Sequence, residues 1–319
     1  MLSEHRDPTT IARLPALALC LLVGAAGTLD RAVAEAPRGA LAKRQSQPTP
    51  LELSAETEAR CVAILRQSLK SDEFWPSMHA AEALTLAGHG EEVRTALEPR
   101  LATETDDRQR CGLAREIVRA GDVSRVDVLL EVLAKDDAYG HVHAAESLYK
   151  VGQIGDGRLL RAAMAREESP PLQLMAAAAL GRCGSPVAMQ LVREKLADKD
   201  LDVSRIAAWV LARLGDESDV GPLRENLPRM ETPLAVCFFE CALAALGDAA
   251  GREALVRNLT AEDPGVRTFA ATFAGELGMR AAADQLIKML DDPAEDVRIR
   301  AAQSLLVLAR PKRPDAGST

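Results

Sequence analysis

Apolar and small residues recur along this chain with a fixed period. Seven glycines set the register at separations of 31 to 33 residues: Gly88, Gly121, Gly152, Gly184, Gly215, Gly247 and Gly278. Seven residues before most of these glycines lies the second member of an alanine pair, as in Ala144-Ala145 and Ala270-Ala271. An apolar segment with helical spacing follows each glycine. A period of this length over six intervals indicates an array of stacked supersecondary units.

Each unit is expected to be a pair of antiparallel helices. A helix of about twelve residues carries the alanine pair, and the glycine ends it in a left-handed conformation. The small pair allows neighbouring helix axes to approach within about 8–10 Å. Ala301-Ala302 begins an eighth unit that ends after one helix, and the pattern leaves open what covers it. The pattern therefore predicts an all-α, right-handed α-solenoid of about 7.5 helix pairs over residues 73–309.

Two segments of the repeat resemble a known family. Val266-Arg267-Thr-Phe-Ala270-Ala271 and Val297-Arg298-Ile-Arg-Ala301-Ala302 are similar to the V-R-x-x-A-A signature of HEAT repeats. The short unit is most similar to the HEAT-like repeats of bilin lyases, and the resemblance covers residues 73–310. It implies that the alanine-pair helices line the concave face of a superhelix. By the same resemblance, that face is where a partner binds.

The first 72 residues divide into three predicted segments. Residues 1–34 are predicted to be a signal peptide, because an uncharged apolar run of fourteen residues precedes a small-x-small cleavage site before Glu35. We therefore expect export to the periplasm or secretion, with a lipoprotein attached through Cys20 as the alternative. Residues 35–53 are a Pro-containing linker. Residues 54–72 form an N-terminal capping helix with Ser54 as its N-cap, and 310–319 form a polar tail expected to be disordered.

Composition and charge narrow the possible partners. Apolar residues make up 47% of the chain but aromatic residues only 3%, so Ala and Leu fill the core, which disfavours an all-β fold. The net charge of −8 argues against a nucleic-acid partner, since phosphate binding needs a basic surface. The N-terminal apolar run is too short for an integral membrane span, which needs about 20 residues. The oligomeric state is left open.

The first three units depart from the repeat in a related way. Two of them carry His79-Ala-Ala-Glu82 and His143-Ala-Ala-Glu146, and the unit between them places Arg115 at the glutamate position. Residues three apart share a helix face, so each histidine can bond its own glutamate. Stacking places Glu82, Arg115 and Glu146 in one row. This row is either a structural polar ladder or the floor of a binding groove.

Three further side chains lie at the expected mouth of these units. Trp75, Tyr139 and His141 would supply aromatic and polar contacts to a ligand in the groove, although the two aromatic rings can equally be packing residues. The full candidate binding set is Trp75, His79, Glu82, Arg115, Tyr139, His141, His143 and Glu146.

The sequence favours neither a metal nor a cofactor. His79 and His143 lie two units apart, about 16–20 Å at the usual packing distance, which is too far for one zinc ion. Deoxyhypusine hydroxylase is a HEAT-like enzyme whose iron ligands are His-Glu dipeptides, and this sequence has no such dipeptide. The resemblance thus extends to the HEAT-like fold but not to the metal ligands. We expect no cofactor and no catalytic residue.

The preferred function is therefore a non-catalytic scaffold. Its concave face, at units one to three, would hold a protein partner or an extended ligand. The alternatives are an enzyme derived from HEAT repeats, similar to a bilin lyase, and an accessory module of a secreted enzyme complex.

Overall fold

The computed structural model describes residues 50–310, and their regular structure is helical throughout. The predicted all-α repeat architecture is therefore confirmed. The predicted signal peptide (1–34), the linker as far as residue 49 and the tail from residue 311 lie outside the described residues. Ser54 is the predicted N-cap, and its Oγ accepts a hydrogen bond of 3.1 Å from the Thr57 amide.

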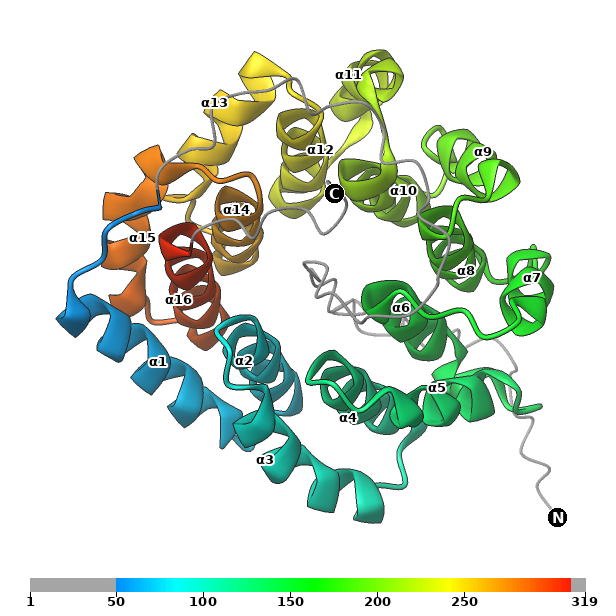
Figure 1. The fold of residues 1–319 in the computed structure, drawn as a ribbon. Coiled ribbons are helices and arrows are strands. Elements are labelled where there is room, and N and C mark those ends of the chain that lie inside the picture. Colours follow the sequence, from blue (N-terminus) through cyan, green and yellow to red (C-terminus); the bar gives the residue numbers. More distant parts are fainter. Residues whose placement is uncertain (1–49, 311–319) are drawn as a thin grey trace, which may run out of the picture.

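The helices form two concentric layers (Figure 1). The inner layer consists of α2 (Phe74–Leu86), α4 (Asp107–Arg119), α6 (His141–Val151), α8 (Pro170–Arg182), α10 (Leu201–Leu214), α12 (Pro233–Ala245), α14 (Pro264–Glu276) and α16 (Glu295–Ala309). The outer layer consists of α1 (Ala55–Leu69), α3 (Gly90–Thr103), α5 (Val126–Leu133), α7 (Arg158–Met164), α9 (Pro186–Lys195), α11 (Val220–Asn226), α13 (Ala249–Asn258) and α15 (Ala283–Lys288). Short 3₁₀ turns flank some of them, at Val123–Arg125, Ala138–Gly140, Glu217–Asp219, Leu227–Arg229, Arg280–Ala282 and Met289–Asp291.

The inner layer closes on itself into a ring (Figure 1). Each inner helix packs against the next, and α16 packs against α2. The outer helix α1 contacts α16 before it and α2 after it, in the same way that α3 contacts α2 and α4. Helix α1 therefore covers α16 in the position that an outer helix takes in the other units.

Polar contacts hold the closing seam between the first helices and the last. The Leu51 amide donates to the Leu308 carbonyl at 2.9 Å, so part of the predicted linker lies against α16. Arg60 of α1 pairs with Asp291, and the guanidinium of Arg310 donates to the Leu86 carbonyl. Because these bonds join residues more than 220 positions apart, the two ends of the array stabilise each other.

The glycine that ends each inner helix has the expected conformation in all but one unit of the described chain. Gly152 is itself the C-cap of α6, with a left-handed φ of 68°. In the other left-handed units the glycine follows the C-cap residue, as Gly88 with φ 88° follows Ala87. Gly215 differs, because it is extended with φ −75°. A Cβ at Gly215 would lie 2.6 Å from the Leu211 carbonyl oxygen and 2.8 Å from the Asp219 carboxylate. Close packing rather than a left-handed turn therefore requires glycine there, which corrects the sequence prediction at this position.

Candidate binding site on the inner face

Trp75 and His143 lie together although they belong to units one and three. Their rings stack with centroids 5.3 Å apart and planes inclined by 15°. Trp75 reaches α6 by crossing α4 at Gly112, where a Cβ would lie 2.9 Å from the Phe74 ring and 3.4 Å from the Trp75 ring. A glycine in the helix interior, otherwise unfavourable, therefore makes room for the aromatic pair. The stack fixes the first turns of α2 and α6 on one rim of the ring.

Tyr139 and Arg108 extend this rim toward solvent. The Arg108 guanidinium lies 4.1 Å from the centroid of the Tyr139 ring, and its Nε donates to the Tyr139 carbonyl at 3.3 Å. The Tyr139 hydroxyl donates to Asp106 at 2.8 Å, which raises the pKa of the tyrosine. Tyr139 remains 47% exposed. We call Trp75, Arg108, Tyr139 and His143 the rim platform.

His141 is not part of the rim platform. Its ring is buried, and its Nε2 lies 3.0 Å from the Lys135 carbonyl oxygen. This contact ties the start of α6 to the segment that follows α5. The structure therefore separates His141 from Trp75 and Tyr139, with which the sequence grouped it.

A continuous chain of buried charges lies below the rim. Arg115 Nε donates to Glu116 at 2.6 Å, and Glu116 also accepts from Arg119. Arg119 lies 3.2 Å from Glu82, and Glu82 accepts a further bond of 3.1 Å from Arg300 of α16. We call this alternating series, Arg115–Glu116–Arg119–Glu82–Arg300, the charge chain. It joins α2, α4 and α16 across the closing seam.

The other predicted polar residues pair beside the charge chain. Glu146 pairs with Lys150 one turn along α6, at 2.6 Å. His79 Nδ1 lies 2.6 Å from the Asp296 carboxylate of α16 rather than bonding Glu82 on its own helix, which corrects the local pairing expected from the spacing. Burial, aided by the nearby charge of Arg300, lowers the pKa of His79, although Asp296 opposes the shift.

Burial and charge shift several pKa values in this cluster. Burial alone would raise the pKa of Glu82, but Arg119, Arg300, Lys150 and Arg115 together lower it to about 2. Burial lowers the pKa of Lys150 to about 8 despite its pairing with Glu146. Glu82 is therefore ionised at neutral pH and depends on the arginines around it.

The candidate row of Glu82, Arg115 and Glu146 is paired and buried, His79 is paired with Asp296, and His143 is stacked on Trp75. His79, Glu82, Arg115, His143 and Glu146 are each no more than 6% exposed. This geometry has the form of the structural polar ladder that the sequence left as one of two readings. The sequence did not identify the other members of the network, Glu116, Arg119, Lys150, Asp296 and Arg300. A signal existed for part of it, because Arg119, Lys150, Arg182 and Arg213 all occur two residues before a repeat glycine.

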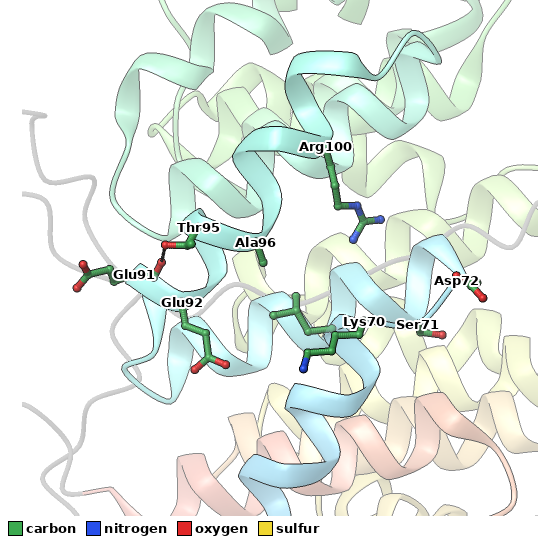
Figure 2. A pocket seen from close by; sticks show the side chains of 9 residues that line it. Lys70, Ser71, Asp72, Glu91, Glu92, Thr95, Ala96 and Arg100 are labelled. Carbon is green, nitrogen blue, oxygen red and sulfur yellow. Dashed lines mark hydrogen bonds between the residues drawn. The ribbon is translucent and has the colours of Figure 1, made fainter.

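An open groove lies on the outer side of the ring (Figure 2). It has a volume of about 810 Å³ and lies between the end of α1, the turn after it and α3. Its lining includes Lys70, Asp72, Glu91 and Arg100, so charges of both signs face it. Arg100 donates to Ser77 at 2.8 Å. None of the predicted site residues lines this groove.

Residues 50–310 show neither a metal-binding cluster nor a membrane-crossing helix. No group of three or more His, Cys, Asp or Glu side chains there could hold a metal ion. No helix in that part of the chain is long and apolar enough to cross a membrane.

Comparison with known proteins identifies the architecture. The family model of HEAT repeats matches residues 157–233 and 241–306. The chain is a HEAT-repeat protein. Its distant relatives include bovine deoxyhypusine hydroxylase, to which this HEAT-repeat chain is 28% identical over 203 residues. That match covers 52% of the chain and 65% of the bovine enzyme, which is less than two thirds of its length.

Two solved structures are similar to this chain at low TM-scores. Human deoxyhypusine hydroxylase in complex with glycerol is 21% identical with a TM-score of 0.39, covering 80% of this chain and 97% of that one. An engineered protein is 20% identical with a TM-score of 0.30, covering 79% of each chain.

Proposed function

We propose that this HEAT-repeat protein is a non-catalytic scaffold that binds a protein partner, or another extended ligand, at the rim platform. The exposed ring of Tyr139, held by Arg108 and Asp106, is the observation that carries the proposal. Arrays of this kind commonly use their inner surfaces for binding. The buried charges below the rim, Glu82, Arg115 and Glu146, support the platform rather than contacting the partner.

The composition of the rim platform supports a protein partner. Tyrosine, tryptophan and arginine are the residues most enriched at interface hot spots. Tyr139 is the one aromatic side chain among the large apolar residues that are exposed in residues 50–310; the others are Val123, Val187 and Val256. Because Arg108 stacks on Tyr139 and bonds its carbonyl, both side chains are ordered before a partner arrives. Such preorganisation lowers the entropic cost of binding.

A capture experiment tests this proposal. The mature protein is immobilised as wild type, as an Arg108→Gln/Tyr139→Ser double variant, and as an Arg158→Gln/Val187→Ala control. Both control positions lie on outer helices and are strongly exposed. We expect partners from an extract of the producing cells to bind the wild type and the control but not the rim variant. Equal capture by all three folded proteins would contradict a binding role of the rim.

The alternative of a catalytic role rests on the partial similarity to bovine deoxyhypusine hydroxylase. We prefer the non-catalytic function because the chain has no His-Glu dipeptide. His79 is also bonded to Asp296, and His143 is stacked on Trp75. Iron loading followed by metal analysis distinguishes the non-catalytic function from the catalytic one. Stoichiometric iron that is lost in a His79→Gln/His143→Gln variant would favour the enzyme, or an accessory module with a metal of its own.

We also propose that the protein is exported, with residues 1–34 removed. The apolar run and the Ala32-Val33-Ala34 site support this. Mass spectrometry of the protein purified from its native cells should find a mature chain beginning at Glu35. A chain that retains residues 1–34 without a lipid would contradict the proposal, and a lipid-modified Cys20 would support the lipoprotein alternative.

A further inference from the structure

Arg300 carries an unused hydrogen-bonding edge beside its contact with α2. Its side chain is fully buried, and Nη1 donates to Glu82 at 3.1 Å and to Gln303. Its Nε and Nη2 atoms are also buried, yet neither has a hydrogen-bond partner among the described residues. These two N–H groups form one side of the planar guanidinium, and that side matches the two oxygens of a carboxylate or phosphate.

The charge chain ends in an arginine on both sides. It contains three arginines and two glutamates, so it carries one positive charge in excess when all five are ionised. At the end opposite Arg300, the buried Nη2 of Arg115 also lacks a hydrogen-bond partner. The neighbouring pair, Glu146 and Lys150, is neutral as a unit. A buried charge without its hydrogen bonds is costly. A bound acceptor would supply the hydrogen bonds that the end arginines of the charge chain lack.

Two acids besides Glu82 interact electrostatically with Arg300, and both have partners of their own. Asp296 is bonded to His79, and Glu276 accepts from Arg213 at 3.3 Å. Burial also raises the pKa of Glu276 to about 7, against the influence of Arg213, so this carboxyl is partly protonated near neutral pH. It therefore repels an added anion less than an ionised carboxylate would.

We infer that the protein binds one small oxyanion, a carboxylate or phosphate group, on the Nε–Nη2 edge of Arg300, where α16 meets α2. Both N–H groups donate to the anion, and the excess positive charge of the chain is neutralised. The bound group would tie α16 to α2 and α4 through Glu82 and Arg119, and so stabilise the closed ring. This inference is independent of any partner at the rim platform.

Thermal unfolding of the full mature chain tests the site with defined probes. The dialysed protein is measured in sodium phosphate, sodium acetate and sodium chloride at equal ionic strength. We expect phosphate or acetate to raise the Tm above its value in chloride, in a saturable way. A response to acetate alone identifies a carboxylate, and a response to phosphate identifies a phosphoryl group. Identical Tm values in the three salts would mean that water occupies the edge, and would overturn the inference.

Substitution then locates the anion. Arg300→Lys keeps the positive charge but removes the two-pronged edge, so the apparent affinity should fall about tenfold or more. Arg66→Lys is the matched control, because Arg66 uses the same Nε–Nη2 edge to bind Glu92 at the surface. Unchanged anion affinity in a folded Arg300→Lys variant would overturn the assignment. If that variant does not fold, native mass spectrometry of the wild type decides, since the inference requires one retained anion per chain.

Discussion

The space beside Gly112 determines where Trp75 can lie. Phe74 and Trp75 occupy the volume that a side chain on α4 would fill, and only then does Trp75 contact His143. A residue that contributes no side-chain contacts of its own thus decides the geometry of the rim platform.

Gly112→Ala should therefore destabilise the protein although alanine is the better helix former. The added methyl would lie 2.9 Å from the Phe74 ring, and we expect the free energy of unfolding to fall by about 1–3 kcal/mol. Gly221→Ala is the control, because nothing lies within 4 Å of the new Cβ in α11. It should instead gain up to about 1 kcal/mol from helix propensity. Urea denaturation measures the free energy of unfolding of both variants. Equal increases in the two would contradict the packing argument.

Glu276 should give the stability a pH dependence with a defined sign. Its pKa rises from 4.5 to about 7 on folding, so between these values the folded protein holds a proton that the unfolded chain has lost. The free energy of unfolding should fall as the pH rises through this window, by up to about 3 kcal/mol. In Glu276→Gln this contribution disappears. Urea denaturation from pH 4.5 to 8 should show a difference between the two proteins, and parallel curves would contradict the shift.

Sequence reasoning could find unusual residues but not their partners. His79, Arg115 and His143 stand out because each breaks an otherwise apolar or small repeat position. Their actual contacts depend on the closed ring, since Asp296 lies 217 residues from His79 in the chain. A repeat pattern predicts neighbours one unit apart, and it carries no information on contacts between the first unit and the last.

At the scale of elements, helix pairs were predictable because each unit repeats the same physical signals. The alanine pairs and the glycines are local features, and local features determine where helices begin and end. The packing of α1 was not predictable in the same way. A single amphipathic helix before the array can cover its first unit, connect it to another segment, or close it into a ring. The contact between α1 and α16 shows that it closes the ring.

Leu65→Ala tests the packing of α1. Leu65 is fully buried in this helix, which packs on α16 and α2, and its truncation should cost about 2–5 kcal/mol of unfolding free energy. Val187→Ala, at a position that is 69% exposed, should change stability by less than about 0.5 kcal/mol. Guanidinium denaturation compares them. Equal small effects would show that α1 does not complete the ring in solution.

At the scale of the whole molecule, closure gives every inner helix two inner neighbours. The charge chain lies where the ring closes. The charged residues that depart from the repeat pattern therefore also join the first and last units of the ring. The departures in the first units that the sequence marked as functional thus have a structural role in addition to any binding role.

Closure also limits how this architecture can change in evolution. An open array can gain or lose a unit at either end, because each unit needs only its neighbours. In the ring, deletion of one unit would leave a gap of about 8–10 Å between helices that must touch, and duplication would force two helices into the space of one. The number of units is thus set by the circumference. Change must come through substitutions within the existing units.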